Sequence, residues 1–261
     1  MNSLKIIFAG TPDFAVPALQ ALHDKGYEVA GVLTQPDRPS GRGLKLHPSA
    51  IKLKATTLGI PVYQPSELKS QQSYETLAAI DFNVMIVAAY GLIIPQAILD
   101  LPSLGCFNIH ASLLPRWRGA APIHRAILIG DKTTGVTIMR VVQKLDAGDM
   151  VKKAEIQISE NDTTEQLTKT LSILGANLMT EVMDELAKKG ELQSSPQNEA
   201  NVTYAEKVTK EESKINWHDP ALVIARKVRA FNSFPVAQTE YREAVCKIWH
   251  AEVAADANED A

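Results

Sequence analysis

The first half of the chain alternates short apolar runs with stretches that have helical spacing, and this alternation restricts the fold more than any other feature. The apolar runs are rich in Val, Ile and aromatic residues, are bounded by Gly or Pro, and are predicted to be buried strands at 4–10, 27–34, 60–64, 83–90 and 105–111. Helices are predicted between them over 13–25, 48–58 and 66–80, with Pro48 at one helix start and Ser66 as the next cap. Strands covered on both faces and separated by helices predict a doubly wound α/β fold with a mostly parallel sheet.

The pattern changes after residue 130. The segments 133–142 and 149–158 alternate apolar and polar residues, which predicts an antiparallel pair added to the sheet. Thr163 or Thr164 then opens a long helix that ends before Gly190. Its apolar stripe, which we expect to pack on the sheet, is Leu167, Leu171, Leu174, Leu178, Val182 and Leu186.

The composition also suggests a division into domains. A first domain is expected over 1–190, and polar residues from about 191 to 203 indicate a linker that we place at 191–206. A helix is expected at 219–230, followed by alternating residues typical of strands. Two or three strands without closure do not make an independent domain, so we expect the chain to end partway through a second domain at 207–261.

Composition excludes several classes of protein. No apolar run approaches the roughly 20 residues that span a bilayer, and the N-terminus has no signal-peptide pattern. Cys106 and Cys246 cannot form a disulfide framework, which favours a cytoplasmic location. The net charge is −3, so binding to nucleic acid would depend on local patches. Two such patches are 34–54, with five basic residues and one acidic, and 207–229, with six and three.

Two common kinds of site are also disfavoured. The first strand–turn–helix, FAGTPDF, lacks the glycines that a dinucleotide pyrophosphate needs, and Gly41-Arg42-Gly43 lies in the middle of a Pro-rich loop. The six histidines show no H-E-x-x-H pattern and no pairing with cysteine. We therefore predict neither an NAD-type site nor a metal site.

The segment 105–122, GCFNIHASLLPRWRGAAP, carries the strongest chemical signal. Asn108 and His110 share one face of a predicted strand and point to its carboxyl end, where open α/β sheets bind ligands. An amide donor beside an imidazole suits attack on an acyl-like centre, although two such residues are commonly just hydrogen-bonded. Asp146 lies in a Gly-containing turn and either forms that turn or orients a histidine.

With N-I-H-A-S-L-L-P at 108–115 and L-D-A-G-D at 145–149, the sequence resembles the folate-dependent formyltransferases. Further matching segments run in order from residue 5 to about 250 and include IIFAGTPDFAVPAL, VAAYGLIIP, GVTIM and VTYAEKVTKEE. The segment TQPDRPSGRG favours the branch that acts on methionyl initiator tRNA over relatives in purine synthesis.

The resemblance implies a formyl donor, 10-formyltetrahydrofolate, and an acceptor, the α-amine of methionyl initiator tRNA. It assigns catalysis to Asn108, His110 and Asp146. It implies a folate pocket near 88–95 and at 112–115, with the 141–146 turn as one wall. The folate-binding residues expected on this basis are Ala89, Tyr90, Gly91, Ile93, Ser112, Leu113, Leu114, Pro115 and Val142.

The resemblance also implies how tRNA is held. It makes 34–48 a flexible loop at the tRNA acceptor end and the C-terminal domain a small β-barrel similar to an OB fold. The tRNA contacts expected on this basis are Arg38, Arg42, Lys45 and Lys207. We expect a monomer without a membrane anchor.

In the expected reaction the free amine attacks the formyl carbon, and Asn108 and His110 donate hydrogen bonds to the oxygen of the tetrahedral intermediate. His110 could instead take the ammonium proton, with Asp146 fixing its tautomer, and the sequence leaves both roles open. Two alternatives remain. One is a formyltransferase for a small amine, such as a purine precursor or an amino sugar. The other is a non-catalytic RNA-binding module that uses 34–54 and the C-terminal region.

Overall fold

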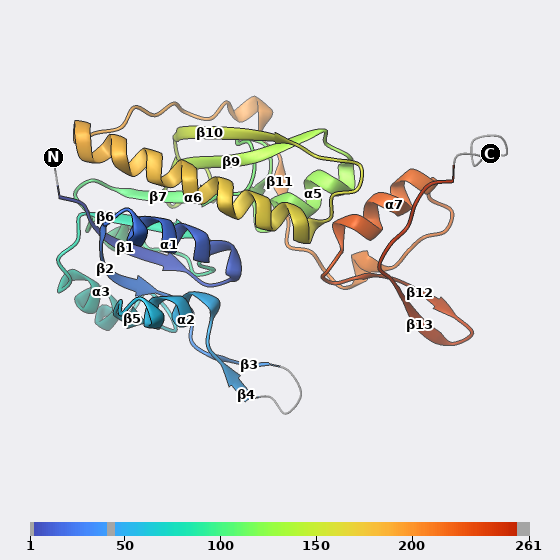
Figure 1. Cartoon of the computed structure of the whole chain (residues 1–261), viewed down its shortest axis with the longest axis horizontal. Coiled ribbons are helices and arrows are strands. Elements are labelled where there is room, and N and C mark those ends of the chain that lie inside the picture. Colours follow the sequence, from blue (N-terminus) through green and yellow to red (C-terminus); the bar gives the residue numbers. More distant parts are fainter. Residues whose placement is uncertain (1–2, 41–44, 255–261) are drawn as a thin grey trace. The chain divides into compact units, whose positions relative to one another are not determined.

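The computed structural model describes residues 3–40 and 45–254 (Figure 1), and the chain divides into two compact units. The first unit consists of Met1–His110, Val136–Ala154 and Leu171–Asn198. The second consists of Ala111–Gly135, Glu155–Thr170 and Glu199–Ala261. Because the chain passes between the units several times, single strands and helices contribute residues to both.

A seven-stranded sheet in the order β10-β9-β7-β6-β1-β2-β5 forms the centre of the fold. Its strands are β1 Lys5–Gly10, β2 Glu28–Leu33, β5 Val62–Tyr63, β6 Val84–Ala88, β7 Cys106–His110, β9 Thr133–Arg140 and β10 Met150–Gln157. β1 pairs parallel with β2 and β6, β5 joins β2 in parallel, and β7 joins β6 in parallel. β9 pairs antiparallel with β7. The predicted doubly wound, mostly parallel sheet is therefore confirmed.

The helices of this region are short except for one. They are α1 Val16–Asp24, α2 Ala50–Thr57, α3 Gln71–Ala78, α4 Gln96–Leu99 and α6 Thr164–Lys189, with a 3-10 turn η1 at Asp13–Ala15. The expected helix starts at Pro48 and Ser66 were wrong. Ser49 caps α2 by accepting the Lys52 N–H at 3.1 Å, and Ser70 caps α3 by accepting the Ser73 N–H at 3.2 Å. In each case the hydroxyl that meets the third backbone N–H of the helix determines where it begins.

The two faces of the sheet are covered by different helices. Ile7 and Ala9 of β1 join one core cluster with Leu77 of α3 and Ile98 of α4. Side chains alternate along a strand, so Ile6 faces the opposite side, where α1 and α6 lie (Figure 1).

The apolar stripe of α6 is buried as predicted, apart from Leu174, which is half-buried. α6 approaches the sheet closely at Gly175, where a Cβ atom would lie 2.6 Å from Cγ2 of Ile109 on β7. The helix ends before Gly190, whose φ of 77° is in the left-handed region that favours glycine.

The segment predicted as a flexible loop, 34–48, contains a hairpin in its described part. β3 Arg38–Ser40 pairs antiparallel with β4 Lys45–His47. In Figure 1 this hairpin extends away from β2 and α2. Backbone pairing thus formed where the sequence has no apolar alternation, and the flexibility expected for 34–48 stays a prediction. Arg42 lies outside the described residues.

The base of this hairpin is tied to the first unit by polar contacts. Lys52 Nζ lies 2.7 Å from Asp37 Oδ2, and Gln64 Nε2 donates to Asp37 Oδ1 at 2.7 Å. The hydrogen bond from Lys52, followed by that from Gln64, holds the pKa of the Asp37 carboxyl below its ordinary value of 3.8. Gln64 Nε2 also donates to the Gln35 carbonyl at 3.0 Å. The hairpin therefore starts from a fixed base.

The second unit combines short strands with two helices. Its elements are β8 Arg118–Gly119, α5 Pro122–Ile129, η2 Glu199–Asn201, β11 Tyr204–Ala205, η3 Glu211–Ser213, α7 Ala221–Ala230, β12 Ala237–Tyr241 and β13 Ala244–Ile248. β8 pairs parallel with β11, and the fully buried Arg118 donates to Glu199 Oε1 at 2.9 Å. α7 confirms the helix predicted at 219–230, whereas α5 and the β8–β11 pair were not predicted.

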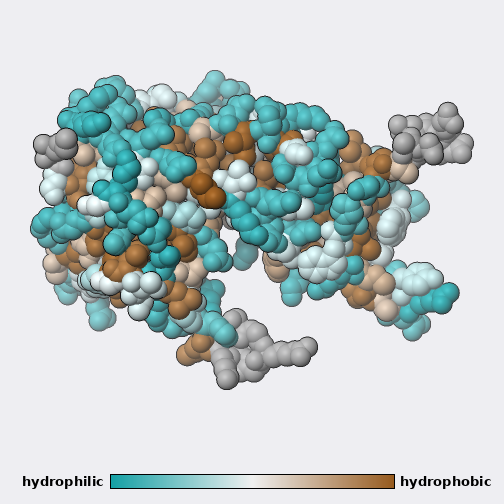
Figure 2. Space-filling model, viewed as in Figure 1, coloured by the Kyte–Doolittle hydropathy of each residue, from teal (hydrophilic) through white to brown (hydrophobic). Residues whose placement is uncertain are grey.

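The C-terminal part of the second unit has a small core and an exposed apolar surface. Ile215, Val228 and Ala237 form its buried cluster. β12 and β13 pair antiparallel. In the part of the chain described, which ends at residue 254, these two strands form an open sheet and not a closed barrel. Apolar residues, coloured brown, are exposed at the surface in the region of α7 and this sheet (Figure 2). The large exposed residues there are Trp217, Leu222, Phe234, Tyr241, Val245 and Trp249.

Candidate active site

A histidine and a carboxylate meet at the carboxyl end of β7. His110 is the last residue of that strand, and its Nδ1 lies 3.6 Å from Oδ2 of Asp146. Both side chains are largely buried, with 6% and 15% of their areas exposed. The distance exceeds that of a hydrogen bond, and a small rotation of either side chain would bring the two groups within hydrogen-bond distance. The predicted approach of these residues, which are far apart in sequence, is present in the structure.

Asn108 lies on the same face of β7 as His110. It is in register with Val87 of β6 and Met139 of β9, and it is half-buried. Ile109 points to the other face, toward α6, so Asn108 and His110 both face away from that helix.

Cys106 shares the face of Asn108 and His110 but does not have their chemistry. Burial, followed by the charge of Asp100, raises the pKa of the Cys106 thiol to about 12. A thiol with that pKa is protonated near neutral pH and is a poor nucleophile. Cys106 belongs to a buried core cluster, so we assign it to packing.

The Asp146 turn (residues 145–149) has an unusual backbone. Asp146 has a φ of 45°, in the left-handed region that L residues other than Asn and Asp rarely occupy. A Cβ atom at Gly148 would lie 1.9 Å from the Arg140 carbonyl oxygen, so the turn packs directly on the end of β9. Gln197, which is 8% exposed, donates from Nε2 to the carbonyls of Asp146 and Gly148, each at 2.8 Å. The turn is therefore held from both sides.

The segment after β6, expected to bind folate, is also strained and anchored. Ala89 has a φ of 49° and Gly91 one of 85°. The Tyr90 carbonyl accepts from Thr11 Oγ1 at 2.9 Å and from Gln35 Nε2 at 3.0 Å. Thr11 and Gln35 were not predicted, although both follow the carboxyl ends of parallel strands, where ligand sites of open sheets gather.

The other residues expected to bind folate differ in how exposed they are and in the unit to which they belong. In the first unit Tyr90 is buried, whereas Ile93 is 76% and Val142 43% exposed. In the second unit Ser112 and Leu114 are buried, and Leu113 and Pro115 are half-buried. The Ser112 hydroxyl donates to the Arg116 carbonyl at 2.6 Å. The expected folate residues therefore belong to both units.

The residues expected to contact tRNA lie at the surface where they are described. Arg38 on β3 and Lys207 after β11 are exposed. Lys45 is the first residue of β4.

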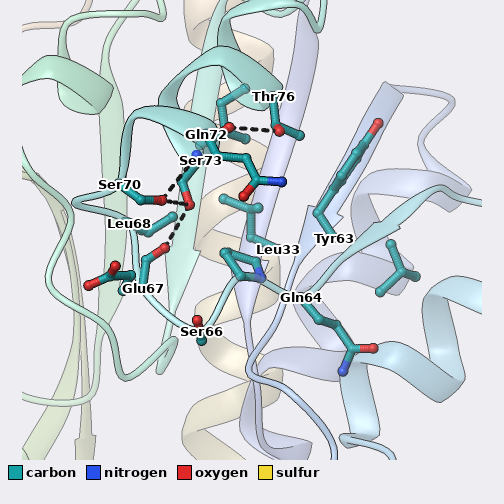
Figure 3. A pocket seen from close by; sticks show the side chains of 13 residues that line it. Leu33, Tyr63, Gln64, Ser66, Glu67, Leu68, Ser70, Gln72, Ser73 and Thr76 are labelled. Atoms are coloured by element: carbon teal, nitrogen blue, oxygen red, sulfur yellow. Dashed lines mark hydrogen bonds between the residues drawn. The ribbon is translucent and has the colours of Figure 1, made fainter.

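A pocket of about 510 Å³ lies at the carboxyl end of β5, beside α3 (Figure 3). The Ser70 hydroxyl donates to Ser73 Oγ at 2.9 Å, and the Ser73 hydroxyl donates to the Glu67 carbonyl at 2.7 Å. None of the predicted site residues lines this pocket. β5 is four strands away from β7 in the sheet, which is roughly 19 Å. The pocket is therefore separate from the His110–Asp146 pair.

Within residues 3–40 and 45–254, no three His, Cys, Asp or Glu side chains form a group that could hold a metal ion. Over the same residues, no helix is long and apolar enough to cross a membrane.

Comparisons with known proteins identify the family. The profile described as Formyl transferase matches residues 4–183, and that described as Formyl transferase, C-terminal domain, matches residues 207–261. The methionyl-tRNA formyltransferase of Methylobacillus flagellatus is 54% identical over 249 residues, which are 95% of this chain and 81% of that protein. The chain belongs to the methionyl-tRNA formyltransferase family.

Solved structures of formyltransferases share the fold at low identity. A sugar N-formyltransferase from Shewanella superposes with a TM-score of 0.73 at 18% identity, covering 97% of this chain and all of that one. An N-formyltransferase from Helicobacter canadensis, in complex with folinic acid and dTDP-3-aminofucose, gives 0.71 at 19% identity, covering 94% and 86%. The resemblance inferred from N-I-H-A-S-L-L-P and L-D-A-G-D is thus confirmed at the level of the family.

Proposed function

We propose that this chain transfers the formyl group of 10-formyltetrahydrofolate to the α-amine of methionyl initiator tRNA. The observation that carries the proposal is the His110–Asp146 pair at the end of β7, in a chain that is 54% identical to a methionyl-tRNA formyltransferase along 95% of its length. A family member with a buried acid–base pair at a strand end has the groups that acyl transfer requires.

The reaction begins with attack of the amine on the formyl carbon. An α-amino group has a pKa of about 7.7–8.0, so part of it is neutral near pH 7 and already nucleophilic. The new C–N bond places the electron pair of the formyl C=O on oxygen. When that pair returns, the bond between the formyl carbon and N10 of the folate breaks. The amine loses one proton and N10 gains one, so the overall exchange is balanced.

Three side chains divide the work in this scheme. The Asn108 side-chain amide donates to the oxygen of the tetrahedral intermediate, because it shares the face of His110 at the carboxyl edge of the sheet. His110 Nδ1 faces the Asp146 carboxylate, so we assign proton exchange with the substrates to Nε2. Asp146 orients the ring and fixes its tautomer.

Folate binding is assigned to the anchored segment after β6. The positive φ angles of Ala89 and Gly91 turn the backbone sharply, and the Thr11 and Gln35 side chains hold the Tyr90 carbonyl between them. The exposed Ile93 and Val142 side chains offer apolar surface for an aromatic ring system. Ser112, Leu113, Leu114 and Pro115 complete the assignment through the family resemblance.

Binding of tRNA is assigned to the β3–β4 hairpin and to Lys207. The exposed Arg38 on β3 offers a guanidinium fork to phosphate oxygens, and Arg42 and Lys45 follow in the same basic segment. We further propose that the enzyme works in the cytoplasm and as a monomer. A monomer is sufficient for the proposed chemistry because His110 and Asp146 come from the same chain. Light scattering after size-exclusion chromatography tests the oligomeric state.

One assay tests the whole proposal. The chain is incubated with 10-formyltetrahydrofolate and one acceptor at a time, which is methionyl initiator tRNA, an amino sugar nucleotide or a small free amine. We expect rapid formylation of the charged tRNA and slow reaction of the others. Preference for the amino sugar nucleotide would support the small-amine alternative, and no transfer to any acceptor, together with RNA binding, would support the non-catalytic one.

A further inference from the structure

Gln197 is buried in a segment whose residues are mostly polar and exposed. It follows α6 in ELQSSPQNEANVT, and only 8% of its area is exposed. Its Nε2 donates one hydrogen bond to the Asp146 carbonyl and one to the Gly148 carbonyl, both at 2.8 Å. A side-chain amide nitrogen has two N–H donors, so these bonds use both of them.

The segment around Gln197 is fixed by its own backbone. The Met150 N–H donates to the Ser195 carbonyl at 2.8 Å, and the Ser195 N–H donates back to Met150 at 2.9 Å. The Leu192 carbonyl accepts from Arg140 Nη2 at 3.4 Å. Residues 192–197, which we name the strap, therefore run along the start of β10 and place Gln197 beside the Asp146 turn.

The turn needs such support because its conformation is unfavourable by itself. Asp146 has a left-handed φ of 45°, which aspartate adopts more readily than most L residues but which still depends on surrounding contacts. Gly148 prevents the turn from moving toward β9, because its α-carbon already lies against the Arg140 carbonyl. Gln197 supplies the restraint at both carbonyls of the turn.

We propose that Gln197 is a positioning residue, which holds the Asp146 turn so that the carboxylate stays within reach of His110. It acts through the backbone of the turn, whose Asp146 and Gly148 carbonyls it holds. This inference rests on the proposed function, in which Asp146 orients His110. A displacement of about 1 Å in such a carboxylate is enough to slow catalysis by roughly 100-fold.

A double-mutant cycle tests the proposal in the full chain. Gln197→Met keeps the side-chain volume but removes both donors, and we expect kcat to fall about 10–100-fold with both KM values nearly unchanged. In an Asp146→Asn background, where the orienting carboxylate is already lost, the same change should lower kcat less than about threefold. Gln193→Met, an exposed glutamine on the same strap, is the matched control and should retain wild-type kcat.

The outcomes distinguish a failure of the role proposed for Asp146 from a failure of the role proposed for Gln197. If Asp146→Asn retains wild-type activity, the proposed role of Asp146 fails. If Asp146→Asn is impaired but Gln197→Met matches Gln193→Met, the role of Gln197 fails. An equal loss in both backgrounds would mean that Gln197 acts on folding or elsewhere, and this also overturns the proposal. Should Gln197→Met fail to fold, Gln197→Asn, which keeps the amide on a shorter side chain, goes through the same cycle.

Discussion

The Asp146 turn and the β3–β4 hairpin both carry residues assigned to function, but they are held in different ways. The turn is held by neutral bonds from the buried Gln197 amide to backbone carbonyls. The base of the hairpin is held by the Asp37–Lys52 ion pair, in which nearly a third of each side chain is exposed. In the proposed function, the residue assigned to chemistry is therefore fixed by a buried side chain. The residues assigned to tRNA binding instead project from an exposed strand pair whose base is an ion pair.

The largest effect is expected when the chemistry itself is removed. His110→Ala should lower the rate on the order of 10²–10⁴-fold, because its proton transfer is lost. Both charged tRNA and a small amine should be affected equally, since both acceptors would use the same ring. Rates with each acceptor, together with a melting temperature to verify folding, provide the measurement. A loss confined to tRNA would place His110 in recognition and remove the distinction between the two regions.

An intermediate effect is expected in the basic segment 34–48. Arg42→Ala should reduce kcat/KM for charged tRNA about tenfold, because a charge-assisted bond to phosphate is lost. The slope of log kcat/KM against log salt should become shallower by about 1. The small-amine rate is the control and should stay the same. If both acceptors suffered equally, this segment would belong to the folate site or to folding.

A smaller effect is expected at the base of the hairpin. Asp37→Ala removes the partner of Lys52 and one acceptor for Gln64, so β3 and β4 lose their fixed starting direction. We expect kcat/KM for charged tRNA to fall roughly threefold, since one partly exposed pair contributes at most about 1 kcal/mol. Glu67→Ala, which replaces another exposed carboxylate of the first unit, should leave this rate unchanged. A loss as large as that of His110→Ala would show that the base also supports catalysis.

The smallest effect concerns pH. The folded-state pKa of Asp37 is depressed, so its contribution to stability is present above 3.8 and is lost as pH falls through the lower, folded-state value. NMR titration of its carboxyl carbon should give a midpoint below 3.8 that rises toward 3.8 in Lys52→Met. The contacts between Gln197 and the turn, by contrast, join an amide to two backbone carbonyls and contain no titrating group. A midpoint unaffected by Lys52→Met would show that the ion pair does not anchor the hairpin.

Much of the sheet follows from local sequence patterns. The runs that became β1, β2 and β6 are mostly apolar because helices cover both faces of these strands. The β3–β4 hairpin was missed because its residues are polar and Pro-rich and show no alternation. The strands β8 and β11 have two residues each, which is too short for any periodic signal.

The candidate site could be predicted only in part. Alternation along a strand already puts Asn108 and His110 on one face. The antiparallel pairing of β9 with β7 ends with Arg140 opposite Phe107, at the start of β7, so the segment after β9 must fold back for Asp146 to approach His110. Gln197 is 51 residues from Asp146 in the chain, and nothing in its neighbourhood distinguishes it from the exposed Gln193. Such tertiary contacts leave no local pattern in one sequence.

The glycine in the middle of α6 shows how a weak position in one element can serve another. By helix propensity alone, Gly175 is a defect that costs about 0.5–1 kcal/mol relative to alanine. Its missing side chain, however, leaves the room that Ile109 occupies, between the strand residues Asn108 and His110. Gly175 therefore acts as a spacer that sets how closely β7 lies against α6. Substituting alanine would strengthen the helix and yet force helix and strand apart, so here a stabilising choice for one element would misalign the chemistry on its neighbour.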